Sequence, residues 1–152
     1  MIEFENAIEI DRPIALVFDF LADLENLPKW NYFVTRVTKT DSGPAGVGST
    51  YHQVRRSDRQ DLLIVEFEAH RLLTVETIPP SKPDLLRRMI FEDMGDKTRV
   101  IDHWKLDTGH PAILQMVGKG RVKSAVRENL TKLKELLETG KVTLQDGRQA
   151  TL

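Results

Sequence analysis

Hydrophobic and polar residues alternate at the start of the chain. In EFENAIEI, residues 3–10, Phe4, Ile8 and Ile10 share one parity and the glutamates take the other. A period of two is typical of a β-strand with one face in solvent. The following DRPIALVFDFLAD instead carries a broad apolar stripe behind a capping residue, Asp11, which predicts a helix. The next stretch, LENLPKWN, predicts a second short helix that its proline interrupts.

From Tyr32 to Leu106 the pattern predicts one strand after another, separated by turn-forming residues. In DLLIVEFEAH, Leu63, Val65 and Phe67 are predicted on one face of a strand and the glutamates on the other. The stretch LRRMIFEDMGDKTRVIDHWKLD predicts a hairpin that turns at MGDK. Consecutive hairpin connections imply an antiparallel sheet, and its apolar face needs a cover.

A long helix from about Pro111 to Leu137 is predicted as that cover. Apolar residues recur along it at steps of three and four: Val122, Val126, Leu130, Leu133 and Leu137. Gly140 is a predicted stop, and residues 139–152 are expected to form a polar tail after a single domain, residues 1–138. The fold class is therefore α+β, with a curved antiparallel sheet of six to seven strands around the C-terminal helix and two short helices after the first strand.

Composition narrows the classes of protein. The 152 residues are 40% apolar and 30% charged, which suits one globular domain with a hydrophobic core. A net charge of −1 argues against a nucleic-acid-binding surface. No apolar run approaches the ~20 residues of a membrane span, and the acidic N-terminus lacks a signal pattern. We therefore expect a cytoplasmic protein without integral membrane contact.

Metal, nucleophile and phosphate-binding motifs are absent from the sequence. The chain has no cysteine, and His52, His70, His103 and His110 lack the spacing of metal ligands. No serine has a GxSxG setting, and GPAGVG opens onto a predicted strand rather than a helix. We predict neither a metal nor a cofactor. Gly118–Gly120 falls within the predicted long helix. It indicates a tolerated weak spot or close packing on the sheet, or else room for a ligand or a bend that opens a portal.

The strand TRVIDHWKL contains the most informative polar residue. Asp102 and Trp104 share the parity of Val100 and Leu106, so they are predicted to face the helix. A buried carboxylate is costly unless it is paired. Asp102 is therefore either a structural group or a polar anchor or acid/base group in a ligand cavity.

The partner of Asp102 and the register of two strands stay open at this point. Arg121 or Asn6 could satisfy the carboxylate. A bulge would turn His103 inward in place of Asp102. The same question of parity applies to the neighbouring stretch Tyr51–Gln53, which includes His52. We interpret each histidine as a surface residue, or as one whose hydrogen bonds are made within the protein, rather than as a catalytic residue.

The order and spacing of these segments resemble the START-like helix-grip (SRPBCC) superfamily, and within it the polyketide cyclase/dehydrase and lipid-transport type. The resemblance runs from Ile2 to Leu137, through FENAIEIDRPIALVFDFLAD, LENLPKWN, GPAGVGSTYH, GDKTRV and RENLTKLKELLE. It implies a hydrophobic cavity between sheet and C-terminal helix. Members bind lipids, sterols, polyketides or plant hormones, and some are cyclases or aromatases. The superfamily has no invariant catalytic residues, so the resemblance supports the fold more firmly than it supports an activity.

The resemblance also places Trp30 and Phe33 near one end of the cavity, which the second short helix closes. We interpret Trp30 as a core residue that seals this end and buries ~150–250 Å². The second interpretation is that Trp30 lines the cavity and contacts the ligand directly. A partner surface is the weakest, because one tryptophan among charged residues is no extended apolar patch.

Three functional hypotheses follow. The first is a carrier or sensor that binds a small hydrophobic ligand: a lipid, a polyketide-like aromatic or an isoprenoid. The second is a polyketide cyclase/aromatase or dehydratase, with Asp102, His103 and Tyr51 as candidate catalytic residues. The third is a protein-interaction module of the co-chaperone type, and a homodimer is possible. The expected cavity lining is apolar with two polar contacts: Val65, Phe67, Trp104, Ile113, Met116 and Val117, with Tyr51 and Asp102.

Overall fold

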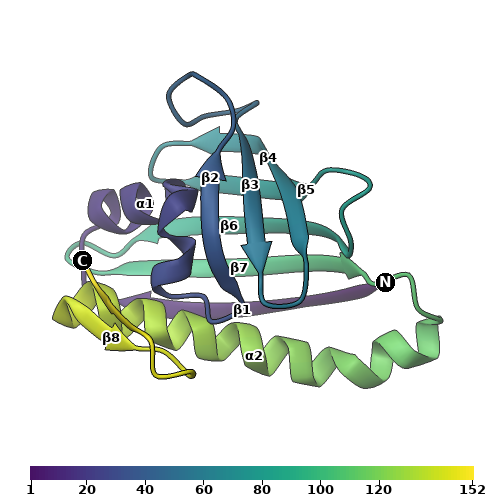
Figure 1. Ribbon diagram of the computed structural model, residues 1–152. Coiled ribbons are helices and arrows are strands. Elements are labelled where there is room, and N and C mark those ends of the chain that lie inside the picture. Colours follow the sequence, from purple (N-terminus) through teal and green to yellow (C-terminus); the bar gives the residue numbers. More distant parts are fainter.

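The computed structural model describes residues 1–152 and shows a seven-stranded antiparallel sheet curved beside one long helix (Figure 1). The strands are β1 (Ile2–Ile10), β2 (Val34–Lys39), β3 (Thr50–Arg55), β4 (Arg59–Glu68), β5 (Leu72–Thr77), β6 (Asp84–Asp93) and β7 (Thr98–Asp107). The short helices α1 (Ile14–Ala22) and η1 (Leu24–Lys29) follow β1, and α2 (Ala112–Thr139) is the long helix. The predicted helix-grip fold is confirmed.

The sheet has the order β1-β7-β6-β5-β4-β3-β2. Strands β2 to β7 form successive hairpins, and β1 adds to the free edge of β7, opposite Asp102 at Asn6 and opposite Trp104 at Phe4. Burial along β1 alternates as its sequence predicts, with Ile2 and Phe4 inside. The sheet therefore has β1 at one edge and β2 at the other, and only the β1 edge lies along α2 (Figure 1).

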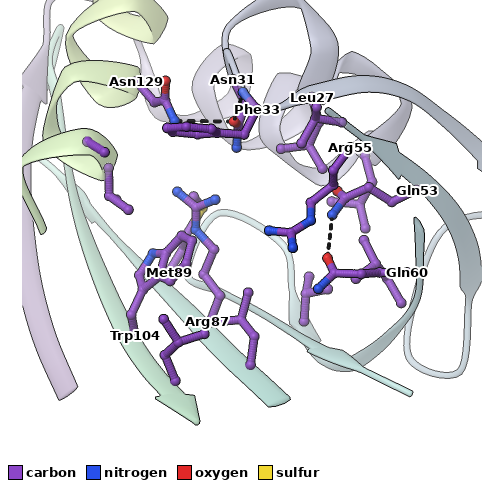
Figure 2. Close-up of a pocket in the computed structure, with 18 of the residues that line it drawn as sticks. Leu27, Asn31, Phe33, Gln53, Arg55, Gln60, Arg87, Met89, Trp104 and Asn129 are labelled. Atoms are coloured by element: carbon purple, nitrogen blue, oxygen red, sulfur yellow. Dashed lines mark hydrogen bonds between the residues drawn. The ribbon is translucent and has the colours of Figure 1, made fainter. Parts of the chain in front are cut away.

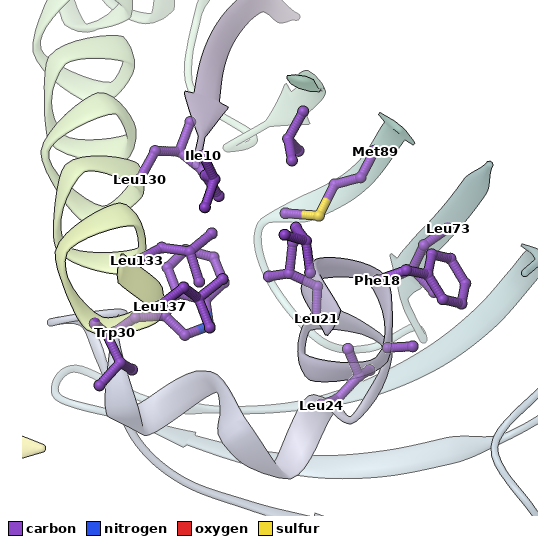
Figure 3. Packing of buried hydrophobic residues seen from close by; sticks show 14 of the residues in the cluster. Ile10, Phe18, Leu21, Leu24, Trp30, Leu73, Met89, Leu130, Leu133 and Leu137 are labelled. Carbon is purple, nitrogen blue, oxygen red and sulfur yellow. The ribbon is translucent and has the colours of Figure 1, made fainter. Parts of the chain in front are cut away.

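The C-terminal part of α2 carries the core. Leu130, Leu133 and Leu137 are at most 1% exposed and point toward Ile10 of β1 and the side chains of α1 and η1 (Figure 3). The helix ends at Gly140, whose φ of 85° is left-handed and whose N–H donates to the Leu136 carbonyl. The predicted apolar face is thus confirmed in this half of the helix, and Val126 continues it toward the N-terminus.

The N-terminal part of α2 differs from expectation. Ile113, Met116 and Val117 are 75%, 72% and 80% exposed. The inward side here is marked by Gln115, which is buried, and by Val122 seven residues later, so the three apolar residues lie on the opposite side. The expectation that they line the cavity needs this correction.

Gly118 and Gly120 lie in the same part of α2. A Cβ atom at either position would meet no atom within 4 Å. Close packing on the sheet, which was one interpretation of this stretch, is therefore wrong. The helix runs without interruption through both residues.

Strand β4 also differs from its sequence prediction. Its register against β5 shifts between Ile64 and Glu66, which marks a β-bulge. Before the shift, Leu62 and Ile64 face the core, so the expected inward position of Leu63 is wrong, and Val65 is the unpaired residue at the shift itself. After the shift, Phe67 packs against the core as expected. One extra residue exchanges the two faces of a strand, and no periodicity in the sequence marks it.

The segment expected to be a polar tail folds into a hairpin of β8 (Lys141–Thr143) and β9 (Gln149–Thr151). Its Val142 and Leu144 are buried in the main core, and Arg148 donates to the carbonyls of Val34 and Asn31. Packing of the core thus continues past residue 138. None of the helices has the length and apolar content needed to cross a membrane.

Candidate functional site

A pocket of about 380 Å³ lies between the concave face of the sheet, η1 and the middle of α2 (Figure 2). Of its 25 lining residues, 16 are hydrophobic, so the wall is mainly apolar. Pockets that take small molecules typically measure ~300–1,000 Å³ and combine apolar walls with a few polar groups. This pocket has both properties.

The pocket exists because the helix covers the sheet unevenly. α2 runs beside β1, at one edge of the sheet, while β3 to β6 curve away from it (Figure 1). The space left over is closed at one end by η1. The residue before this helix, Asp23, caps it by accepting a hydrogen bond from the Glu25 N–H. Apolar side chains from η1 and the strands, such as Leu27 and Met89, form the wall without filling the space.

Trp30 directly follows η1 and contributes both to the hydrophobic core and to the pocket wall. It is 1% exposed and belongs to the main hydrophobic core, as we interpreted it from the sequence, and it also lines the pocket. Phe33 lies at the rim, where it is 40% exposed and packs edge-to-face on Tyr32. Trp104 lines the pocket from β7 and stacks on Phe4. The pocket therefore brings together three of the predicted residues.

Asp102 faces inward, as the strand parity predicts, and is fully buried. Its partner is neither Arg121 nor Asn6 but Arg87 of β6, whose Nε and Nη2 donate to the two carboxylate oxygens at 2.9 and 2.7 Å. The indole N–H of Trp104 lies 3.1 Å from both oxygens. Asp102 is not on the pocket surface; Arg87 lies there in front of it.

Arg87 is the residue that sequence reasoning missed most clearly. It lies opposite Trp104 in the β6–β7 register, which places it diagonally across from Asp102. Its guanidinium carbon lies 4.8 Å from the Trp104 ring centre and 5.3 Å from that of Trp30. Counting register outward from the predicted MGDK turn would have brought Arg87 and Trp104 together, because a hairpin turn fixes the pairing of its strands.

Polar groups from other elements reach the pocket as well. Arg55 of β3 forms a two-point ion pair with Asp58, with both N–O distances 2.7 Å. Gln53 donates to Gln60 at 2.9 Å. Asn129 of α2 donates to Asn31 at 3.2 Å (Figure 2). None of these residues carries a motif, so only the three-dimensional arrangement identifies them.

Tyr51 and His103, the other candidate catalytic residues, lie away from the pocket surface. Tyr51 is 1% exposed in the core, and burial, together with the charges of Asp23, Asp41 and Glu25, raises its pKa to about 12. Its hydroxyl therefore stays protonated near neutral pH and is a poor base.

His103 lies on the outer face of the sheet, 2.9 Å from Glu3, and His52 is likewise outside, 2.9 Å from Asp61. The bulge that would have turned His103 inward is absent, since β7 pairs with both neighbours in an unbroken register. Val65 and Phe67 also lie outside the lining; Phe67 instead packs edge-to-face on Phe18. No group of three or more His, Asp or Glu side chains is arranged to hold a metal ion.

A curved antiparallel sheet around a long C-terminal helix, with a pocket between them, defines the START-like helix-grip class of proteins. The family model for polyketide cyclase/dehydrase and lipid transport matches residues 1–138, and the chain belongs to this family. No curated protein sequence matches it.

Solved structures share the fold at low sequence identity. XoxI from Bacillus cereus is 13% identical with a TM-score of 0.71, over 89% of this chain and 94% of that one. The di-domain ARO/CYC BexL from the BE-7585A biosynthetic pathway is 14% identical with a TM-score of 0.70, over 93% of this chain and 49% of that one. The Aha1 dimer from Colwellia psychrerythraea is 19% identical with a TM-score of 0.67, over 92% and 98%. At such identities the likeness shows the fold alone.

Proposed function

We propose that this protein binds a small hydrophobic molecule in the pocket between the sheet and α2, as a carrier or sensor. The observation that carries the proposal is the pocket itself: about 380 Å³ of space with a mainly apolar wall. An apolar wall that is left open to water costs free energy, and a ligand with an apolar body removes that cost. A lipid, a polyketide-like aromatic or an isoprenoid meets this requirement.

A polyketide cyclase or dehydratase is the second candidate, and membership of the family favours it. Such an enzyme needs a positioned acid or base at the pocket surface. The lining contains no histidine or tyrosine, and Glu76 is its only carboxylate. The residues of the pocket therefore support binding better than proton transfer. A role as a protein-interaction module, with or without homodimer formation, would use the outer surface and leaves the pocket unexplained.

We expect an environment-sensitive apolar dye to bind in the pocket and to alter the protein's own fluorescence. Both tryptophans of the chain, Trp30 and Trp104, line the pocket, so their emission reports on its contents. The variant Ala125→Phe places a ring in the pocket from α2 and should abolish the signal. Titration of the dye, followed by tryptophan emission, measures both effects.

The matched control is Ser124→Phe, one residue away on the same helix, because Ser124 is exposed and does not line the pocket. It should bind the dye as the natural protein does. Equal dye binding by Ala125→Phe would place the dye elsewhere, for example on the exposed apolar side of α2, and would contradict the proposal.

A further inference from the structure

We propose that the ligand of this pocket is an acid: an apolar body that ends in an anionic oxygen group, recognised by Arg55, Arg87 and Arg121. The inference rests on the proposed binding function and adds the chemical class of the ligand's polar end. It comes from a comparison of the hydrogen-bond donors and acceptors that the pocket wall leaves free.

The free donors are guanidinium nitrogens. Arg55 and Arg87 each commit Nε and Nη2 to one carboxylate, Asp58 and Asp102 respectively, and neither Nη1 forms a hydrogen bond within the protein. Arg121 lines the pocket from α2 and has no ion-pair partner. Each arginine can therefore still donate to a group inside the pocket.

Three of the four side-chain amide oxygens of the wall are in use, whereas the Gln53 oxygen and the Glu76 carboxylate accept no hydrogen bond within the protein. The side-chain oxygen of Gln60 accepts from Gln53, and that of Asn31 accepts from Asn129 and from the Phe33 N–H. The Asn129 oxygen accepts from the Tyr32 N–H. A ligand hydroxyl or amine that must donate thus finds two free acceptor side chains, Gln53 and Glu76, whereas three arginines can still donate. A group that only accepts finds several.

The two ion pairs also fix the guanidinium groups in place. Figure 2 shows Arg55 and Arg87 reaching into the same space from opposite walls, β3 and β6. Asp102 holds Arg87 from behind, and the rings of Trp30 and Trp104 flank it. Asp58 pairs with the same two nitrogens of Arg55, in a more exposed position, with the two side chains 24% (Arg55) and 38% (Asp58) exposed. Donors fixed before the ligand arrives lose little entropy on binding, and guanidinium–oxyanion hydrogen bonds are among the strongest in proteins.

Charge on the lining side chains points the same way. Three arginines face one carboxylate, Glu76. An anionic oxygen is therefore favoured over a neutral one, and a cationic head is disfavoured, inside a wall whose other side chains are uncharged and mostly apolar. Carboxylate, phosphate and enolate share this chemistry, and the size and shape of the pocket do not separate them.

A series of probes with one apolar body and different heads tests the inference. We would titrate the natural protein with decanoate, decyl phosphate, decanol and decylamine at neutral pH, by displacement of the pocket dye. An acid should bind roughly tenfold or more tighter than decanol, which corresponds to one charge-assisted hydrogen bond. Decylamine should bind more weakly than decanol. The ratio of decanoate to decyl phosphate identifies which oxyanion fits better.

Variants assign the preference to the arginines. Arg55→Gln/Arg121→Gln removes two of the three while leaving the Arg87–Asp102 pair, and both side chains are accessible enough for the fold to survive their loss. It should reduce the preference for acid over alcohol by about threefold or more, to the level that Arg87 alone supports, with decanol binding unchanged. Arg36→Gln, an exposed position outside the lining, is the matched control and should keep the full preference.

The outcomes separate this inference from the proposed function. Equal binding of decanoate and decanol by the natural protein, or an acid preference that is unchanged in Arg55→Gln/Arg121→Gln, would overturn the inference and leave hydrophobic binding standing. Absence of binding by the dye and by all four probes would remove the proposed function as well.

Discussion

Asp102→Asn is expected to lower the free energy of unfolding by about 3–5 kcal/mol, because it leaves a nearly buried arginine without its counter-charge. Asp102 is fully buried and Arg87 is 11% exposed, so water replaces little of what the carboxylate provides. The Trp104 indole N–H would lose its charged acceptor too. Urea denaturation followed by circular dichroism measures the change.

The control removes both charges together. Arg87→Met/Asp102→Leu replaces the ion pair with apolar side chains of similar size and should recover much of the stability lost in Asp102→Asn, since a buried pair stabilises little beyond an apolar replacement. A loss below about 1 kcal/mol for Asp102→Asn would show that Arg87 finds another partner or reaches water. From the sequence we expected this substitution to alter ligand choice or its pH dependence more than folding, but Asp102 lies behind Arg87 and off the pocket surface, so the geometry favours an effect on folding.

Leu133→Ala is expected to cost ~2–5 kcal/mol, the range for truncating a buried leucine. Leu133 is 0% exposed in the main core, on the side of α2 that faces β1 and α1, and the rigid sheet cannot collapse into the space left behind. Denaturant melts check the value. Glu135→Ala, an exposed position on the same helix, should change stability by less than about 0.5 kcal/mol.

A cost for Leu133→Ala similar to that of Glu135→Ala would mean that the helix does not pack as described. The assignment of the apolar face of α2 and the packing of this helix against the sheet would then both be wrong.

Periodicity predicted the elements whose environment is uniform along their length. Alternation in β1 and β7 placed Phe4, Asp102 and Trp104 on the inner face, because these strands pair without interruption. The step of three and four in α2 predicted Leu130 and Leu133 in the core. One face of β1 and β7 meets the core from end to end, and one face of α2 meets it along the C-terminal half, so the pattern repeats there.

The predictions that failed concern places where the environment changes within an element. The bulge after Ile64 exchanges the faces of β4 in mid-strand. The first turns of α2 present Ile113, Met116 and Val117 to solvent, while the polar Gln115 faces inward, so apolar character there does not mean burial. In the C-terminal hairpin two apolar residues, Val142 and Leu144, are enough to anchor a segment that reads as polar.

Most of the pocket could not be predicted from the sequence for a related reason. Its polar groups come from residues distant in the chain, such as Asn31 with Asn129, and Arg87 with Asp102. The lining depends on how far the sheet curves from α2, and no local pattern encodes that distance. Trp30 and Phe33 were placed at the pocket by the resemblance to the helix-grip superfamily, and Trp104 was placed there by its parity on the inner face of the predicted strand.

The central claim is that the pocket between the sheet and α2 holds a small molecule. Native mass spectrometry of protein purified from its own host measures this directly, with solvent extraction to recover what is bound. The account predicts an added mass on the natural chain and on Ser124→Phe that is absent from Ala125→Phe. The bare mass of the chain in all three preparations, or the same added mass on Ala125→Phe, would contradict it.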